Sequence, residues 1–166
     1  MLHYRANDAT LAKGDVVCID SGASYGGYGA DITRTLPVGG VFSARQREIY
    51  DLVLKAEMAA IKTVKAGATF AAIDKAARSV IGRAGYADAF IHGIGHHLGL
   101  ETHDVTPSGP LPEHAVITIE PGIYLPDEKI GVRIEDDVVV TKTGCRNLSQ
   151  RIPKKASEIE ALIAGR

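Results

Sequence analysis

The sequence predicts an α+β fold in a single domain, and three observations support this. Strand-like segments come first, two helical segments follow, and strand-like segments return, without the alternation typical of a parallel doubly wound sheet. The length of 166 residues suits one domain with a substantial core. We find no internal repeat, low-complexity tract or linker that would divide the chain. We therefore treat residues 1–166 as one domain.

The first predicted element is a β-hairpin within residues 14–37. Its first strand is the β-branched run 16–20, a turn rich in glycine and tyrosine follows, and the chain returns through 30–36. Two helices are expected next. Ser43 and Gln46 form a capping-box pattern before apolar residues at helical spacing, which predicts a helix from 44 to 65. A second helix begins after Thr69 and ends near Gly85, a usual stop signal.

The second half of the chain is predicted to be mainly strand and loop. Glycines punctuate residues 92–100, and a proline-rich loop covers 106–112. Apolar and β-branched residues predict strands over 115–120 and 130–141, and a short helix over 158–163 closes the chain.

Composition excludes several classes of protein. Lys and Arg total 19 and Asp and Glu total 20, so the net charge is −1 and no basic field attracts nucleic acid. No apolar run approaches the ~20 residues that cross a bilayer, and residues 1–15 lack an export signal. Cys18 and Cys145 form no redox or metal motif. We expect a protein of a reducing, cytoplasmic compartment, without nucleic-acid or membrane partners.

Four acidic residues lie in strand-like, apolar surroundings: Asp20, Asp31, Glu120 and Glu135. Burying a carboxylate as an ion is costly without a cation, so these positions indicate a positive partner. The alternative for any one of them is an ordinary solvent-facing position or an ion pair with Arg34 or Arg133.

Histidines cluster in the same part of the chain. Four of the six lie between residues 92 and 103: His92, His96, His97 and His103. The spacing of His92 and His96 would form a metal-binding face on a helix, but the intervening glycines disfavour a helix and the glutamate of the zinc-protease motif is absent. For His97 and His114, a surface or hydrogen-bonded position is the simpler interpretation.

Carboxylates and imidazoles together predict an oxygen-rich metal site. Two divalent cations would neutralise four carboxylates, and such a pair can bridge a hydroxide for hydrolysis. Oxygen ligands favour Mn²⁺ among the transition metals. Motifs for dinucleotide binding, phosphate loops and serine hydrolases are absent from the sequence.

Five segments, in their order and spacing, resemble the M24 metallopeptidases, a family with the pita-bread fold. They are 20–22 (DSG), 29–35 (GADITRT), 92–100 (HGIGHHLGL), 119–122 (IEPG) and 133–137 (RIEDD). The resemblance covers essentially the whole chain and is strongest to Xaa-Pro aminopeptidase and its relative prolidase. It implies a metal-dependent exopeptidase whose peptide substrate has proline in the second position.

The resemblance also implies a ligand set for two divalent cations: Asp20, Asp31, His96, Glu120 and Glu135. Asp31 and Glu135 would bridge the two ions, and Glu120 would manage the proton of the bridging water or hydroxide. Mn²⁺ is the expected ion, with Co²⁺, Zn²⁺ and Fe²⁺ as alternatives.

Four further residues would act on the substrate. By the same resemblance, His92 and His103 would polarise the scissile amide or stabilise the tetrahedral intermediate. His3 and Arg133 would bind the substrate, Arg133 on the proline side.

The chain departs from this family at its start. Members usually have further helices and strands before the segment that matches residues 2–4, so we expect a catalytic domain shortened at its N-terminus, with a sheet edge exposed. Two alternative functions stay open: a prolidase that cleaves only dipeptides, and a non-catalytic remnant that binds metal or depends on a partner. A second copy of the chain or a complementing chain is the possible protein partner. Creatinase-like chemistry without metal is disfavoured because it does not need all five ligand positions.

Overall fold

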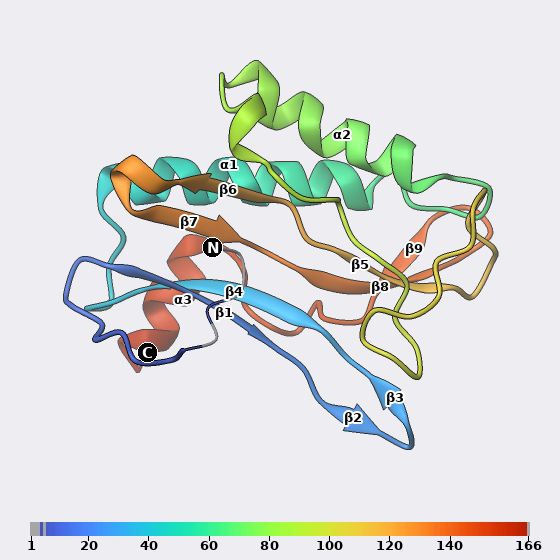
Figure 1. The fold of residues 1–166 in the computed structure, drawn as a ribbon, viewed down its shortest axis with the longest axis horizontal. Coiled ribbons are helices and arrows are strands. Elements are labelled where there is room, and N and C mark those ends of the chain that lie inside the picture. The colour runs from blue at the N-terminus through green and yellow to red at the C-terminus, as the bar shows by residue number, and fades with distance from the viewer. Residues whose placement is uncertain (1–3, 5, 166) are drawn as a thin grey trace.

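The computed structural model describes residues 4 and 6–165, and its fold is α+β, as the order of elements predicts (Figure 1). The strands form a curved layer, and helices α1 (Ala44–Ile61) and α2 (Phe70–Arg83) lie next to each other along it (Figure 1). The third helix, α3 (Ala156–Ile163), contacts α1 and strand β4 (Ile32–Pro37). This is the pita-bread fold that the sequence predicts.

The predicted N-terminal hairpin is confirmed. Strand β1 (Val16–Ser21) pairs antiparallel with β4 (Ile32–Pro37), so that Asp20 lies opposite Thr33. Two short strands, β2 (Ser24–Tyr25) and β3 (Tyr28–Gly29), extend the tip. Within the described residues β4 is the only strand that pairs with β1, so the other edge of β1 has no strand partner there.

Helix α1 (Ala44–Ile61) begins as predicted but ends earlier than expected. The Ser43 hydroxyl accepts from the Gln46 N–H, and the Gln46 side chain accepts from the Ser43 N–H, which completes the capping box. The helix ends at residue 61 rather than 65 because the N–H and hydroxyl of Thr63 both bond to the Ala60 carbonyl. The apolar pattern extends past this point because Val64 is buried from the following turn.

Helix α2 (Phe70–Arg83) agrees with its prediction. The Thr69 hydroxyl accepts from the Ala72 N–H at its start, and Gly85 takes a positive φ just after its end. Its buried face packs on α1 through Ile73, Ala77 and Ile81. A short 3₁₀ helix, η1 (Ala87–Ala89), follows.

The later strands differ from the prediction in number. Strand β5 (Val116–Ile119) confirms the segment 115–120, but the single strand predicted over 130–141 is wrong. It is two strands, β7 (Ile130–Arg133) and β8 (Asp136–Val140), which separate at residues 134–135 to join different sheets. Strand β7 pairs with β6 (Gly122–Leu125), whereas β8 pairs with β5 and with β9 (Cys145–Asn147). The prediction missed β6 and β9.

The core lies between these strands and the two long helices. It contains Ile49 and Val53 of α1 together with Ile117, Ile123 and Val132 of the strands, all fully buried. The 3₁₀ helix η2 (Pro126–Glu128) lies between β6 and β7, and α3 (Ala156–Ile163) begins two residues before the predicted short helix. The packed helices leave the ends of β1, β4 and β5 and the break between β7 and β8 to carry the polar groups described next.

Candidate metal centre

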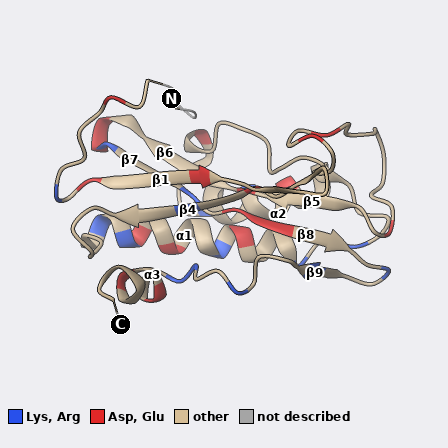
Figure 2. Cartoon of the chain, turned by 90° about the horizontal axis from the view of Figure 1, so that it is seen from below, with Lys and Arg blue, Asp and Glu red and all other residues tan. Residues whose placement is uncertain are grey.

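The structure brings the five predicted ligand positions together. Ligand atoms of Asp31, His96 and Glu135 all lie within 4.8 Å of one another. Nε2 of His96 is 3.8 Å from Oδ2 of Asp31 and 3.4 Å from Oε1 of Glu120. The carboxyl of Asp20 is close enough to that of Asp31 to raise the pKa of Asp31. Acidic residues at the end of β1 and the start of β8 are visible in red in Figure 2.

Strand pairing between distant parts of the chain positions the carboxylates. Glu135 lies in the break between β7 and β8, where its N–H donates to the Thr33 carbonyl at 3.1 Å. The Thr33 hydroxyl donates to Oε2 of Glu135 at 2.5 Å. Because Thr33 also faces Asp20 across the hairpin, this one residue of β4 connects the strand that carries Asp20 with the segment that carries Glu135.

His96 reaches the centre through irregular backbone that pairs with β5. The Thr118 N–H donates to the His96 carbonyl at 2.9 Å, and the Glu120 N–H donates to the Ile94 carbonyl at 2.8 Å. A Cβ on Gly95 would collide with the main-chain oxygen of Thr118, so a glycine is required for this close approach. Gly95, one of the glycines that make a helix improbable here, is therefore needed to place His96 beside Glu120.

The hydrogen bonds of His96 fix which ring nitrogen faces the carboxylates. Nδ1 lies 2.9 Å from the His97 carbonyl oxygen, which can only accept, so Nδ1 carries the proton. Nε2 is the ring nitrogen that faces Asp31 and Glu120, and in the neutral imidazole it presents its lone pair to them. A histidine whose second ring nitrogen donates to a backbone carbonyl is the usual arrangement of a metal ligand.

The pKa values of three of these carboxyl groups are raised because they are buried close to one another. Burial raises the pKa of Glu135 to about 9, and the carboxylates of Glu120, Asp31 and Asp20 add to the rise. Burial also raises the pKa of Asp31 to about 7, with further contributions from Asp20, Glu120 and Asp137. Burial raises the pKa of Glu120 as well. Asp31 is 8% and Glu135 is 1% exposed, so solvent does little to relieve this repulsion. The donor set and its uncompensated charge fit a site for divalent cations.

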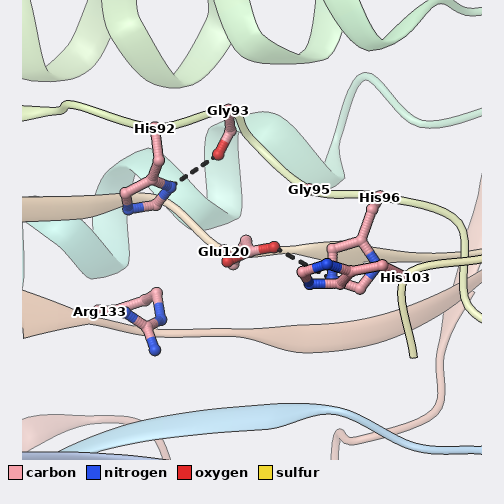
Figure 3. A pocket seen from close by; sticks show the side chains of 7 residues that line it. All are labelled: His92, Gly93, Gly95, His96, His103, Glu120 and Arg133. Atoms are coloured by element: carbon pink, nitrogen blue, oxygen red, sulfur yellow. Dashed lines mark hydrogen bonds and ion pairs between the residues drawn. The ribbon is translucent and has the colours of Figure 1, made fainter. Parts of the chain in front are cut away.

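A pocket of about 210 Å³ opens beside these carboxylates. Its lining includes Glu120 and His96 together with three more predicted site residues, His92, His103 and Arg133. Figure 3 shows His96 and His103 next to each other at one end of Glu120, with His92 and Arg133 toward the other. The ring centroids of His96 and His103 are 4.2 Å apart.

Tyr124 links two of these pocket residues and was missed by the sequence prediction. The Arg133 guanidinium donates to the Tyr124 hydroxyl at 3.0 Å, and Nε2 of His92 lies 2.9 Å from the same oxygen. Burial raises the pKa of Tyr124 to about 12, so the hydroxyl keeps its proton at neutral pH. Nδ1 of His92 donates to the Gly93 carbonyl, so Nε2 accepts the Tyr124 proton. An aromatic residue in a short strand usually belongs to the core, and the sequence carried no signal of this role.

Arg133 is buried and hydrogen-bonded on all sides. It is 4% exposed, and its guanidinium also donates to Oδ2 of Asp20 at 2.7 Å and to the Thr33 hydroxyl at 3.2 Å. The ion-pair alternative therefore holds for Asp20, but Arg34 pairs with Asp136 rather than with any of the four predicted carboxylates. The wall of the pocket and the orientation of Asp20 depend on the same guanidinium.

The remaining histidines lie in different settings. His97 forms bridges to Asp104 and Ile117 and packs edge-on against Phe70, and burial lowers its pKa, in agreement with a structural role. His114 is exposed in a turn with a positive φ. His3, a predicted substrate-binding residue, lies outside the described residues.

Comparison with known proteins gives a family match over most of the chain. Residues 1–142 match the model of metallopeptidase family M24. An Xaa-Pro aminopeptidase from Escherichia coli is 37% identical over 98% of this chain, and an Xaa-Pro dipeptidase from Pyrococcus furiosus is 45% identical over 89% of it. The chain spans 44% and 43% of the length of these two relatives.

Two solved structures are also similar to this chain over most of its length. The Pseudomonas aeruginosa aminopeptidase PepP superposes on 99% of the chain with a TM-score of 0.91 at 40% identity, and the chain covers 45% of it. Prolidase from Pyrococcus furiosus superposes on 86% with a TM-score of 0.81 at 46% identity, and the chain covers 43% of it. Within residues 4 and 6–165, no helix has the length and apolar character needed to span a bilayer.

Proposed function

The chain belongs to metallopeptidase family M24, and from this premise we propose that it hydrolyses the peptide bond between an N-terminal residue and a following proline. The observation that carries the proposal is the convergence of four carboxylates and Nε2 of His96 beside a pocket whose lining includes Glu120 and His96. Proline specificity is supported by the names of the relatives, Xaa-Pro aminopeptidase and Xaa-Pro dipeptidase.

We propose that two divalent cations, expected to be Mn²⁺, are held by five ligands: Asp20, Asp31, His96, Glu120 and Glu135. Asp31 and Glu135 are assigned the bridging positions by the resemblance to the M24 metallopeptidases. Their carboxyl groups lie close together beside His96, and burial raises the pKa of Asp31 to about 7 and that of Glu135 to about 9. When bound, such cations polarise the substrate carbonyl and lower the pKa of a water molecule. A carboxyl pKa that is raised without a cation returns toward its usual range when a cation binds, so the proposal accounts for the shifts.

Residues of the chain provide the remaining steps. Glu120 lies at the pocket wall, and its carboxylate is the group we assign to accept the proton of the attacking water. His92 and His103 also line the pocket and are assigned to the substrate oxygen and the tetrahedral intermediate. Arg133 orients Asp20 and closes the side of the pocket on which we place the proline ring. His3 is proposed as a further substrate contact.

Dipeptide-specific cleavage is the second candidate, because an Xaa-Pro dipeptidase is among the relatives. The Pyrococcus furiosus dipeptidase is 45% identical over 89% of the chain, and the Escherichia coli aminopeptidase is 37% identical over 98% of it. A comparison of Xaa-Pro dipeptides with Xaa-Pro-Xaa tripeptides separates the two: an aminopeptidase cleaves both sizes, whereas a prolidase leaves the tripeptide intact.

The test of the proposed function measures metal content and peptide turnover on one purified sample. We expect two Mn²⁺ ions per chain after loading and release of the N-terminal residue from a peptide with proline in second position. A matched peptide with alanine in that position is expected to resist cleavage. Metal binding without turnover would support the non-catalytic or partner-dependent alternative, and absence of both would overturn the assignment.

Removal of the Tyr124 hydroxyl tests how the pocket is held. We expect Tyr124→Phe to lower kcat/KM by about 10-fold because Arg133 and His92 both lose a partner, while the aromatic ring keeps its packing. Steady-state kinetics with one Xaa-Pro substrate measures the effect. Tyr86→Phe removes a hydroxyl that bonds to Arg45, away from the pocket, and should leave kcat/KM unchanged. Equal kinetics for both variants would show that Tyr124 does not organise the site.

A further inference from the structure

The peptide group of Glu135 is held by a buried guanidinium behind the metal centre. Arg34, in β4, donates through Nη1 to the Glu135 carbonyl at 2.6 Å and to the Thr33 carbonyl at 2.8 Å. Its Nη2 donates to Oδ1 of Asp136 at 2.7 Å. Glu135 belongs to neither β7 nor β8, so ladder hydrogen bonds of those strands do not fix its position.

Asp136 in turn connects Arg34 to a second buried ion pair. Nζ of Lys154 lies 2.6 Å from Oδ2 of Asp136 and 2.6 Å from Oε1 of Glu57, which is fully buried in α1. Nε of Arg34 donates to the Pro153 carbonyl at 2.8 Å, beside Lys154. The segment before α3 therefore also binds the guanidinium of Arg34.

Stability alone does not account for this arrangement. Two cations and two anions are buried or half-buried here, and well-packed apolar residues in their place often give equal or greater stability. The ion pairs hold the guanidinium that fixes the direction of one main-chain carbonyl, which apolar contacts could not do. That carbonyl belongs to Glu135, whose carboxylate is one of the assigned bridging ligands.

The same strand also holds the peptide of the other assigned bridging ligand. The Asp31 N–H donates to Oδ2 of Asp137 at 3.1 Å. The first two residues of β8 thus each hold one of these peptide groups. Asp136 acts on that of Glu135 through Arg34, and Asp137 bonds directly to that of Asp31.

We propose that Arg34 and Asp136 are positioning residues of the metal centre, which set the orientation of the Glu135 carboxylate. Lys154 and Glu57 complete the ion pairs that offset the cost of burying these charges. This inference rests on the proposed function, because it requires that Glu135 binds a cation. It assigns a role to residues that touch neither the pocket nor the ligand atoms.

The test uses Arg34→Lys, which keeps the charge but cannot bond to the Glu135 carbonyl, the Thr33 carbonyl and Asp136 together. Mn²⁺ affinity is measured by isothermal titration calorimetry on metal-free protein, and the geometry of the centre is read from the visible spectrum of the Co²⁺-loaded protein. We expect an affinity loss of about 10-fold or more, with a changed Co²⁺ spectrum. The control is Ile81→Ala, a cavity in α2 that lowers stability without touching this network.

The outcomes separate this inference from the proposed function. Normal Mn²⁺ affinity and an unchanged Co²⁺ spectrum in Arg34→Lys would overturn the positioning role while leaving the metal site intact. Equal losses of affinity in Arg34→Lys and Ile81→Ala would also overturn it, since general destabilisation would then be the cause. If the wild-type protein bound no divalent cation, both proposals would fail. Should Arg34→Lys not fold, Asp136→Asn decides by the same two measurements.

Discussion

Replacement of Glu135 by glutamine is expected to abolish turnover and to empty at least one cation position. The amide keeps the size of the side chain and can still accept the hydrogen bond from Thr33, but it removes one negative charge from a site in which several carboxylates converge. Because the assigned cations supply most of the stabilisation of the transition state, we expect a fall in kcat of more than ~10³-fold. Metal analysis after dialysis and peptide turnover on the same sample measure both effects.

A surface carboxylate provides the control for this variant. Glu113→Gln also removes one negative charge, but from an exposed loop, and should keep the cation content and the turnover of the wild-type protein. Wild-type turnover and cation content in Glu135→Gln would contradict the assigned ligand set.

The stability of the metal-free protein is expected to fall as the pH rises. A carboxyl whose pKa is higher in the folded than in the unfolded chain favours folding fully below the unfolded value and loses that contribution as the pH passes its folded value. For Glu135 the window runs from about 4.5 to about 9, and for Asp31 from about 3.8 to about 7. We expect urea denaturation of chelator-treated protein to show a loss on the order of a few kcal/mol between pH 5 and pH 9 from these groups.

Paired measurements isolate this effect from other titrations. Asp136, Glu128 and Glu160 have lowered pKa values and act in the opposite direction at acidic pH, so the informative quantity is the difference between wild type and Glu135→Gln. Without metal the variant should become the more stable protein at pH 9, and with Mn²⁺ the wild type should regain the advantage. If the difference in stability between wild type and Glu135→Gln did not change with pH, the pKa of Glu135 would not be raised by its surroundings.

Part of the carboxylate cluster could be anticipated from the sequence because two of its residues stand in local contradiction to their surroundings. Glu120 and Glu135 are acidic residues within β-branched, apolar runs, and such residues require a positive partner when they are buried. The glycines around His96 similarly indicated a backbone under tight constraint. The supporting residues showed no such contradiction. Tyr124 looked like a core aromatic, and the partners of Arg34 lie about a hundred positions away, where spacing along the chain gives no information.

The fold was predictable where a local signal marks the end of an element. The capping box at Ser43 and the glycine after α2 set two helix boundaries correctly. The division of residues 130–141 between two sheets was not predictable, because the chain changes its strand partner at residues 134–135 and no glycine or proline marks that change. Only the pairing of Glu135 with Thr33, across 102 positions, reveals the break.

That long separation also sets the order in which the protein can acquire its centre. Helices α1 and α2 are neighbours in sequence and can form early, whereas contact between Thr33 and Glu135 requires closure of most of the chain, a slow step in folding. During synthesis, Asp20 and Asp31 leave the ribosome long before Glu120 and Glu135 exist. No complete set of the proposed ligands is present on the nascent chain until residue 135 has been translated, so a cation held by all five cannot guide the first steps of folding.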